Sequence, residues 1–386
     1  MRLRRVRVEL GARSYEVRIG ADAAFVAREL ARVPRPLYFI TDRNVHHHAW
    51  PALARALRAA RVPVHGPFLI AAGEAQKSPA TLARLWRVLL QAGTDRGACV
   101  VGLGGGMVGD LAGFTAATFM RGIDWIAVPT TLLAMVDAAV GGKVGVNVAA
   151  TKNAAGAFHQ PRAVLAATGF LRTLPPRQRR SGMAEVIKYA MIADPVLFRR
   201  LERDAPAYRR PRRLADAELV ARCAAIKARY VAADERESGM RAALNFGHTI
   251  GHALEGDGRQ GLLHGEAVGL GMLAACDIAA QLGVADPAMR LRLRVLLGQL
   301  ELPVRQPRRV SIGTLRRAWQ RDKKSRAGVP RFVLTPRIGT VSVGREVPDD
   351  IIVRALQGIL ASHPRTTPRA RSRTSRRNAL LHRSGT

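Results

Sequence analysis

Two adjacent prolines, Pro175 and Pro176, separate two halves of the chain whose apolar patterns predict different folds. Upstream, short apolar runs such as LYFITD and ACVVGLGG alternate with segments of helical periodicity, and RVRVEL and SYEVRIG are typical of a hairpin. Downstream, the pattern is nearly all helical. We therefore predict an α/β domain with a mainly parallel sheet over residues 1–176 and an all-α domain over residues 177–362.

Lysine is rare in this chain and falls within motifs rather than in runs of surface charge. Of 62 basic residues only seven are lysines, whereas arginine pairs such as Arg179-Arg180 supply the bulk charge. The two are equivalent as solubilising charge, but not where a compact ammonium must meet a phosphate or move a proton. We therefore interpret the lysines as marks of chemistry; they are Lys77, Lys143, Lys152, Lys188, Lys227, Lys323 and Lys324.

The formal net charge of +33 raises the possibility of nucleic-acid binding. The distribution argues against this as the main role, because Arg121 is the only arginine between Arg96 and Arg162, where motifs are densest. The excess lies in peripheral helices and in residues 363–386. We expect that segment to be a disordered tail that touches RNA or anionic surfaces only weakly.

Neither a membrane span nor a disulfide framework is expected. No uncharged apolar run approaches the ~20 residues that a span requires, and the arginine-rich N-terminus lacks the apolar block of a secretory signal. Three scattered cysteines, Cys99, Cys223 and Cys276, fit core packing in a reducing compartment. We therefore expect a cytoplasmic location.

A glycine-rich turn follows one of the predicted strands. In GLGGGMVGD, three consecutive glycines would let the backbone approach a pyrophosphate, and the helix that follows offers unpaired N–H groups. The pattern is not GxGxxG, so alone it fits either a Rossmann-like nucleotide site or a tight turn. Ligands of parallel sheets bind at the carboxyl ends of strands, where this turn is expected to lie.

Charged and amide side chains follow this turn on glycine-rich connections. They are Asp137, Lys143, Lys152 and Asn153. Amines and an amide beside flexible backbone can form a cradle for a polyanion. Glu237, Arg241 and Asn245 come later, just ahead of two histidines. A pocket that collected these groups would require a substrate with at least two anionic ends.

Three candidate metal ligands lie in the helical half. Glu185 interrupts an apolar helix, His248 and His252 are spaced to share one helix face, and His264 enters the next helix. A carboxylate with two imidazoles is a common catalytic zinc set. Two histidines on one helix are, however, hydrogen-bonded core groups as often as they are metal ligands. The triplet at 46–48 is a weaker candidate, because no carboxylate is close to it in sequence.

Together these motifs resemble those of the 3-dehydroquinate synthase family, within the sugar phosphate cyclase superfamily. The similarity runs in order from about Thr41 to Arg337 and includes GEAQKS, GGGMVGD, VPTTLLAMVDAAVGGK, GMAEVIKY, NFGHTIGHALE, HGEAVGLGM and RDKK. The resemblance implies an NAD-binding α/β domain, a helical metal-binding domain and a site in the cleft between them, in a homodimer.

The resemblance also implies roles for individual residues. One divalent metal, zinc or cobalt, would be held by Glu185, His248 and His264. Catalytic and substrate contacts are implied for Asp137, Lys143, Asn153, Lys188, Lys227, Glu237, Arg241, Asn245, His252 and Lys324, with Arg121 reaching a phosphate across the dimer interface. NAD contacts are implied for Asp42, Asn44, Glu74, Lys77, Gly105, Gly106, Met107, Asp110, Thr130, Thr131, Lys143, Lys152, Phe170, Thr173, Leu174 and Gln178.

The family reaction converts 3-deoxy-D-arabino-heptulosonate 7-phosphate into 3-dehydroquinate and phosphate, in the shikimate pathway. The resemblance implies transient oxidation by NAD, phosphate elimination, reduction, ring opening and aldol closure. Two alternatives stay open: another sugar phosphate cyclase, and a metal-dependent alcohol dehydrogenase of the glycerol dehydrogenase type. Lys227 and Arg241 suit a substrate carboxylate and so favour the synthase, whereas a dehydrogenase would accumulate NADH.

Overall fold

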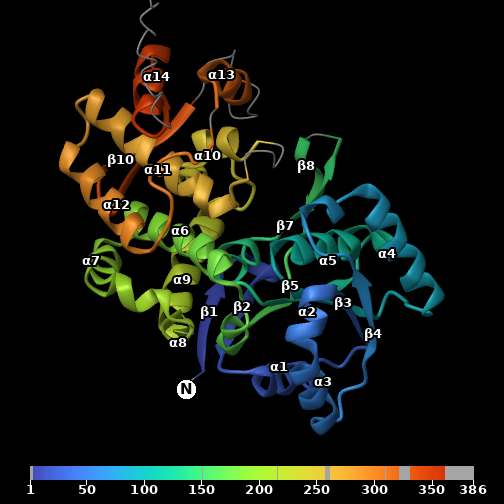
Figure 1. Ribbon diagram of the computed structural model, residues 1–386. Coiled ribbons are helices and arrows are strands. Elements are labelled where there is room, and N and C mark those ends of the chain that lie inside the picture. The colour runs from blue at the N-terminus through green and yellow to red at the C-terminus, as the bar shows by residue number, and fades with distance from the viewer. Residues whose placement is uncertain are drawn as a thin grey trace, which may run out of the picture.

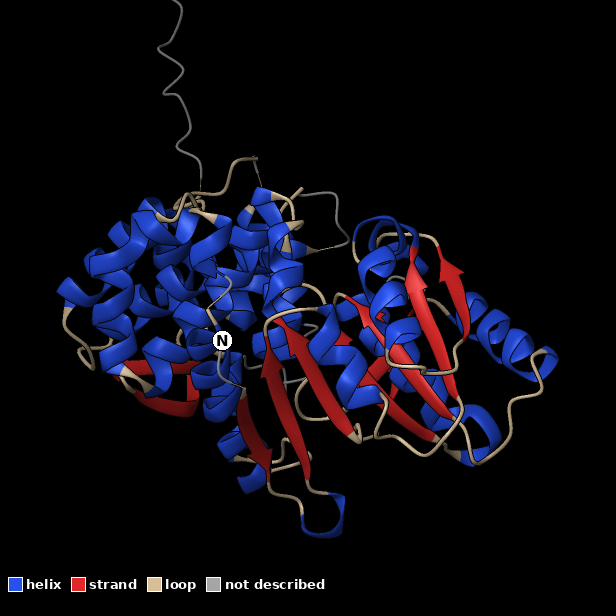
Figure 2. Cartoon of the chain, turned by 90° about the horizontal axis from the view of Figure 1, so that it is seen from below, coloured by secondary structure: helices blue, strands red, loops and turns tan. Residues whose placement is uncertain are grey.

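The computed structural model describes residues 3–149, 151–214, 216–256, 261–308, 310–320 and 331–360. The main sheet lies on one side of the molecule (Figure 1). The helices that follow Pro176 gather on the other side, as the second view shows (Figure 2). The predicted order, an α/β part followed by a helical part, is confirmed.

The main sheet has seven strands and is parallel except at one edge. In order across the sheet the strands are β1 (Arg4–Val8), β2 (Tyr15–Gly20), β9 (Ala163–Ala167), β6 (Asp124–Pro129), β5 (Cys99–Gly104), β3 (Leu37–Asp42) and β4 (His65–Ile70). The edge strand β1 and its neighbour β2 form the predicted antiparallel hairpin, in which Val6 is opposite Val17. Every residue of β3, β5 and β9 is buried, which explains why these strands have continuous apolar runs rather than alternation.

Helices cover both faces of this sheet (Figure 1). Side-chain caps fix where several begin: Asp22 accepts from the Phe25 N–H at 3.0 Å, and Ser78 caps the helix that starts at Pro79. The α-helices are α1 (Ala23–Leu30), α2 (Arg43–His48), α3 (Trp50–Ala59), α4 (Pro79–Gln91) and α5 (Gly106–Thr118). Short helical turns complete this half: η1 (Gly11–Arg13), η2 (Glu74–Gln76), η3 (Phe119–Arg121), η4 (Ala134–Ala138) and η5 (Thr168–Arg172).

A second antiparallel hairpin projects beside the main sheet. It consists of β7 (Lys143–Val148) and β8 (Thr151–Phe158). The segment that we read as glycine-rich connections is therefore extended structure. Gly145 and Gly156 let its two backbones approach closely, since a Cβ on either would overlap a carbonyl oxygen of the other strand.

The later part of the chain is helical, as predicted, but it also contains one hairpin that an all-α prediction does not include. Residues 331–346 form this hairpin, which packs on α11 (His264–Gln281), and Phe332, Leu334 and Thr335 in it are buried. The helices are α6 (Pro176–Ala193), α7 (Pro195–Asp204), α8 (Pro211–Leu214), α9 (Ala217–Ala233), α10 (His248–Glu255), α11 (His264–Gln281), α12 (Pro287–Gln299), α13 (Ile312–Gln320) and α14 (Asp349–Gln357). The remaining elements are η6 (Ala205–Arg209), η7 (Met240–Asn245), β10 (Arg331–Arg337) and β11 (Thr340–Glu346).

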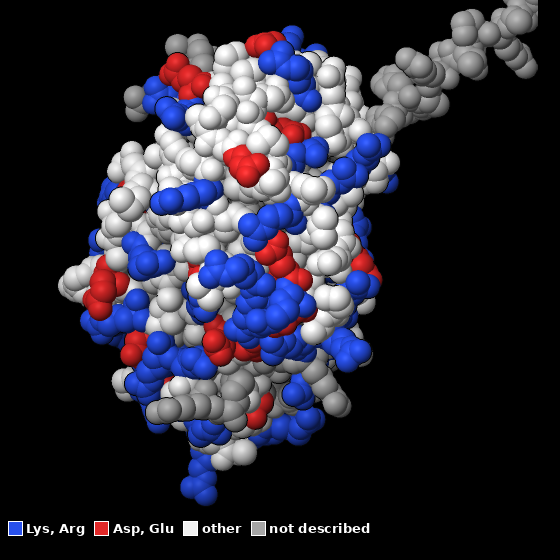
Figure 3. Space-filling view, turned by 90° about the vertical axis from the view of Figure 1, so that its left-hand side faces the viewer, with Lys and Arg blue, Asp and Glu red and all other residues white. Residues whose placement is uncertain are grey.

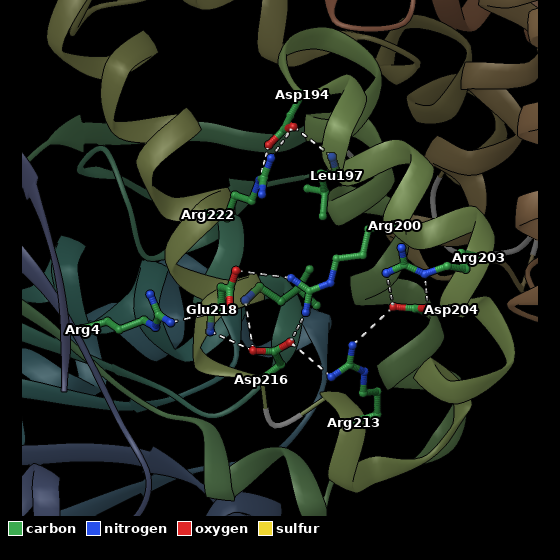
Figure 4. A network of polar contacts seen from close by, with 11 residues as sticks. Arg4, Asp194, Leu197, Arg200, Arg203, Asp204, Arg213, Asp216, Glu218 and Arg222 are labelled. Carbon is green, nitrogen blue, oxygen red and sulfur yellow. Dashed lines mark hydrogen bonds and ion pairs between the residues drawn. The ribbon is translucent and has the colours of Figure 1, made fainter. Parts of the chain in front are cut away.

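The two parts of the chain are joined through the first strand. β1 packs against α9, and Arg4 on β1 lies 3.6 Å from Glu218 on α9. The close-up shows this pair at one end of a polar network, in which Arg200 bonds Asp216 at 2.7 Å (Figure 4). Because β1 contacts the helical part, the domain boundary at residue 176 stays a prediction.

Arginines on the surface form ion pairs with carboxylates, such as Arg292 with Glu202 and Arg354 with Asp350. Lys and Arg spread over one face of the molecule with Asp and Glu among them (Figure 3). Among the described residues, no helix is both long and apolar enough to cross a membrane. The three cysteines are free and buried, and burial raises the pKa of Cys99 and of Cys276 to about 12. The basic segment after residue 362 lies outside the described residues.

Candidate active site at the interdomain junction

One carboxylate and two imidazoles from three helices meet at the junction between the two parts. Oε1 of Glu185 lies 3.7 Å from Nε2 of His248 and 3.4 Å from Nε2 of His264. One ligand atom from each residue lies within 4.8 Å of the others. In a tetrahedral zinc site with bonds of about 2.0–2.1 Å, ligand atoms lie roughly 3.3 Å apart. The spacing therefore fits a metal ion better than direct hydrogen bonds.

The donor set also has the electronic character of a metal site. Glu185 is fully buried. Its Oε2 forms an ion pair with Nζ of Lys188 at 2.5 Å, and its Oε1 has no hydrogen-bond partner. Burial alone would raise the pKa of Glu185, but the Lys188 ammonium lowers it below its usual value. Glu185 is thus an ionised carboxylate that is buried away from water and can still accept a further ligand bond. Such a group suits a cation.

Close packing between helices brings the three ligands together. α10 begins directly after Gly247, which has φ +77°, and α10 packs along α11. A Cβ on Gly271 in α11 would overlap the Gly247 carbonyl and lie 2.8 Å from the Gly251 nitrogen. The start of α11 is held on α6, because the N–H of Gly265 donates to Ser181 Oγ at 3.0 Å. The ligands therefore depend on helix contacts that tolerate only glycine.

We predict that Gly271→Ala separates α10 from α11 and displaces His248. The extra methyl group should lower the free energy of unfolding by about 1–3 kcal/mol and weaken zinc binding, as measured by chemical denaturation and by zinc titration. Gly298→Ala is the matched control, because a Cβ there meets nothing within 4 Å. It should leave stability unchanged or raise it by up to ~1 kcal/mol. Equal behaviour of the two variants would contradict the close-packing argument.

Two further groups surround the metal candidates. The ring of His252 is 5.3 Å from that of His248 and nearly perpendicular to it, and 6.3 Å from that of His264. Glu255 was not singled out in the sequence. One of its oxygens lies 2.6 Å from Nζ of Lys152, and the other lies 3.3 Å from Nδ1 of His264. A signal was present, because Glu255 follows His252 by three residues and so shares its helix face.

Each of the five described lysines lies against a carboxylate. The pairs are Lys77–Asp110, Lys143–Glu237, Lys152–Glu255, Lys188–Glu185 and Lys227–Asp137. Four of these carboxylates were among the predicted site residues. Lys77, Lys188 and Lys227 are buried, whereas about half of the Lys143 side chain and a third of the Lys152 side chain are exposed. Lys323 and Lys324 lie outside the described residues.

Asp137 links the sheet side of the junction to the helices. Its Oδ1 accepts from the hydroxyl of Tyr189 at 2.6 Å, and Nζ of Lys227 lies 2.6 Å from both Oδ1 and the carbonyl oxygen. Burial would raise the pKa of Asp137, but Lys227 and Lys188 hold it well below its usual value. Tyr189 follows Lys188 directly in the apolar helix, and no local pattern in the sequence indicates that it is a site residue.

The pKa values of two buried lysines, Lys188 and Lys227, are shifted in opposite directions. Burial lowers the pKa of Lys227, and Asp137 only partly opposes it. Burial also disfavours the charged form of Lys188, but Glu185 and Asp137 raise its pKa above the usual value. The two neighbouring carboxylates therefore favour the charged form of Lys188, whereas burial favours the neutral form of Lys227.

Arg241 is buried, and backbone carbonyls hold it in place. Its Nη2 donates to the carbonyl of Gly141 at 3.0 Å, and Nη1 donates to the carbonyl of Glu235. The hydroxyl of Tyr15 accepts from the Gly141 N–H at 2.8 Å, which fixes the same turn. The guanidinium has five N–H donors, so it keeps donors for another group.

Two smaller clusters collect the remaining predicted substrate contacts. Glu237 pairs with Lys143 and accepts from Nδ2 of Asn245 at 2.5 Å. Asn153, on β8, accepts from Lys77, whose ammonium also pairs with Asp110. Side chains far apart in sequence are thereby brought into contact.

The predicted NAD contacts follow the carboxyl ends of the parallel strands. β5 ends at Gly104 and α5 starts at Gly106, so the glycine turn lies at this edge. A Cβ on Gly105 would lie 3.1 Å from Thr131, so the turn packs against the segment after β6. Met107 and Asp110 follow this turn in α5, and Thr130 follows β6. Asp42 caps α2, Asn44 is exposed in α2, and Glu74 accepts from Asn147. Of the others, Phe170 is in η5, Thr173 and Leu174 follow η5, and Gln178 is in α6.

Two predicted features are not part of this cluster. Arg121 ends η3 just before β6 begins and is exposed, so it lies at the amino edge of the sheet, opposite the glycine turn. His46, His47 and His48 form the last turn of α2. Among the described residues, the metal-like group of carboxylates and imidazoles is Glu185, His248 and His264.

Comparison with known proteins agrees with this architecture. Residues 67–181 match the family model described as 3-dehydroquinate synthase N-terminal, and residues 182–325 match the C-terminal model of the same family. The 3-dehydroquinate synthase of Nostoc punctiforme is 42% identical over 362 residues, which cover 92% of this chain and 99% of that protein.

Solved structures of related enzymes have the same fold. 2-epi-5-epi-valiolone synthase from Streptomyces hygroscopicus, with NAD+ and Zn2+ bound, superposes with a TM-score of 0.81 at 28% identity. The match covers 91% of this chain and 97% of that enzyme. 2-deoxy-scyllo-inosose synthase, complexed with carbaglucose-6-phosphate, NAD+ and Co2+, superposes with a TM-score of 0.83 at 25% identity. The match covers 92% of this chain and 99% of that enzyme. With both family models matched and this identity over nearly its whole described length, the chain belongs to the 3-dehydroquinate synthase family.

Proposed function

We propose that this protein converts 3-deoxy-D-arabino-heptulosonate 7-phosphate into 3-dehydroquinate and phosphate, with NAD and one divalent metal bound. One observation carries the proposal: the Glu185, His248 and His264 group adjoins the lysine–carboxylate pairs at a single junction. Glu185 belongs to both sets. A site with a metal candidate and many ammonium groups suits a substrate that has a hydroxyl to oxidise and two anionic ends.

Glu185, His248 and His264 would hold the metal, which we infer to be zinc or cobalt. When bound, such a metal supplies a Lewis acid that makes a coordinated hydroxyl more acidic. His252, beside two of the ligands, is placed to hold or move a proton at the substrate. Lys188 holds Glu185 in its ionised form.

The glycine turn and the start of α5 would hold the pyrophosphate of NAD. The backbone N–H groups that begin α5 are unpaired within the helix and face the carboxyl edge of the sheet. Bound NAD supplies a hydride acceptor that the full reaction regenerates. A series of contacts connects α5 with the metal ligands. Lys77 contacts Asp110 of α5 and Asn153, and the neighbouring Lys152 contacts Glu255, which lies beside His264.

The substrate would be held at both ends by groups that are now paired within the protein. We assign the phosphate to Lys143, Asn153 and Asn245, and the carboxylate to Lys227 and Arg241. A dianionic phosphate can compete with Glu237 for the Lys143 ammonium, because charge-assisted bonds to phosphate are strong. The remaining donors of Arg241 form a planar fork that suits a carboxylate.

We also infer a cytoplasmic homodimer. The location is consistent with three buried free thiols. In the dimer, Arg121 would reach the site of the partner, because within its own chain it lies at the opposite edge of the sheet.

The decisive experiment measures phosphate release from the heptulosonate phosphate while NADH absorbance is followed. Phosphate release without net NADH supports the synthase. Stoichiometric NADH would instead identify a dehydrogenase. A heptulose phosphate that lacks the carboxylate is the parallel substrate, and its preferred turnover would identify another cyclase.

Glu255→Gln should weaken zinc binding by about 10–100-fold, because a carboxylate on the outer nitrogen of a ligating imidazole fixes its orientation and basicity. Zinc titration of the metal-free protein by calorimetry measures this effect independently of turnover. Glu202→Gln is the matched control, since Glu202 pairs with Arg292 at 2.7 Å on the outer surface. Zinc affinity that is the same in both variants would show that Glu255 does not position His264.

A further inference from the structure

A cavity lies at the edge of the main sheet opposite the glycine turn. Its volume is about 490 Å³. The amino ends of β5, β6 and β9 contribute Cys99, Ile126 and Ala163 to its lining, and the segment after α1 contributes Val33 and Pro34. These side chains form an apolar floor. No predicted or proposed site residue lines this cavity.

Five arginines from separate segments surround this floor. Arg5 is on β1, Arg18 on β2, Arg32 and Arg35 follow α1, and Arg162 precedes β9. The cavity is lined by two carboxylates, Glu29 and Asp124.

Each lining carboxylate is shared between two guanidinium groups. Glu29 lies 2.8 Å from both Arg18 and Arg32. Asp124 lies 3.2 Å from Arg35 and 2.9 Å from Arg162, and both arginines contact the same oxygen, Oδ2. Two negative charges therefore balance four positive ones, and Arg5 adds a fifth. A further carboxylate, Glu16, binds Arg18 at 2.8 Å and still leaves a positive excess.

The strand register places two of these five arginines next to each other. Arg5 and Arg18 are directly opposite each other in the β1–β2 hairpin. Like charges at opposite positions of an antiparallel pair are destabilising. An anion between these side chains would relieve the repulsion, and this position faces the cavity.

We propose that this cavity binds a small organic anion with two or more carboxylate or phosphate groups. Guanidinium forks match the geometry of both groups. The volume lies within the range of small-molecule sites, about 300–1,000 Å³, and the apolar floor can cover a carbon body. β5 and β6 separate the cavity from the glycine turn by six residues, roughly 20 Å at ~3.3 Å per residue. Both sites can therefore be occupied together.

Hydrogen exchange with NAD and zinc present tests the proposal. The probes are succinate, which has two carboxylate groups, and fructose 1,6-bisphosphate, which has two phosphate groups. Acetate at matched ionic strength is the monoanion control. Either probe should slow amide exchange in residues 29–35, 97–101 and 122–126, and the more effective one identifies the preferred anionic group. If neither probe slows exchange there more than acetate does, the proposal is wrong.

Paired variants with the same charge change complete the test. Arg5→Gln/Arg162→Gln should weaken binding of the effective probe by at least ten-fold and leave phosphate-release turnover unchanged. Arg199→Gln/Arg294→Gln, on exposed positions of α7 and α12, should stay within two-fold of the unmodified protein. If the cavity variant fails to fold, Arg5→Lys/Arg162→Lys replaces it, and loss of the forks should still weaken binding. Equal affinity in the cavity and control variants would overturn the proposal, whatever the result of the synthase assay.

Discussion

Glu185→Gln should remove the bound metal and lower kcat/KM by about 10³-fold or more, since a metal Lewis acid contributes several kcal/mol to transition-state stabilisation. The amide keeps the size of the side chain but loses the charge that a divalent cation requires. Metal content by elemental analysis and phosphate release measure the two effects. The variant should also be less stable, because the buried ammonium of Lys188 would lose its carboxylate partner.

His252→Asn is the control that distinguishes a metal ligand from a residue that only lies beside the ligands. His252 is adjacent to the metal candidates, but it is not one of the three residues whose ligand atoms come together. This variant should keep one metal per chain while turnover falls. A Glu185→Gln protein with full metal content, or a His252→Asn protein without metal, would show that we assigned the ligands wrongly.

Lys143→Arg should lower kcat/KM by about 100-fold although the charge is kept. Nζ of Lys143 pairs with Glu237, which also binds Asn245, so the position of a compact ammonium is defined by that cluster. A planar guanidinium would place the positive charge and its donors differently, and misplacement by ~1 Å can cost roughly this factor. Steady-state phosphate release with both variants, Lys143→Arg and Lys143→Gln, gives the measurement.

The converse exchange is the matched control for this prediction. Arg199 is exposed on α7, so Arg199→Lys should leave turnover unchanged. If Lys143→Arg also retained nearly full activity, only charge would matter at position 143. The interpretation of the sparse lysines as functional groups would then lose its basis.

The main sheet could be predicted because its local patterns agree with its tertiary environment. β3 and β5 are short apolar runs in the sequence, and both are buried on both faces. The β10–β11 hairpin was missed for a related reason: β10 packs on α11, so it has no alternation to distinguish it from a helical core segment. The β7–β8 hairpin was hidden by glycines that usually indicate turns.

The metal group shows where sequence spacing is insufficient. Spacing alone pairs His248 with His252, because they share one helix face. The structure instead joins His248 to His264 and Glu185, since Gly247 and Gly271 allow α10 and α11 to touch. Only the family resemblance made this choice in advance. The contacts of Glu255 with Lys152, and of Tyr189 with Asp137, link residues 103 and 52 positions apart, so no local pattern could indicate them.

The strand order of the main sheet has a consequence for synthesis on the ribosome. β2 lies between β1 and β9, so the inner edge of the first hairpin finds its partner only after residues 163–167 have been made. At about 5–20 residues per second, this edge stays open for roughly 10 seconds or more. A nascent chain with an unpaired strand edge can associate with its neighbours. We therefore expect chaperone protection of the first 160 residues during synthesis to raise the yield of folded protein.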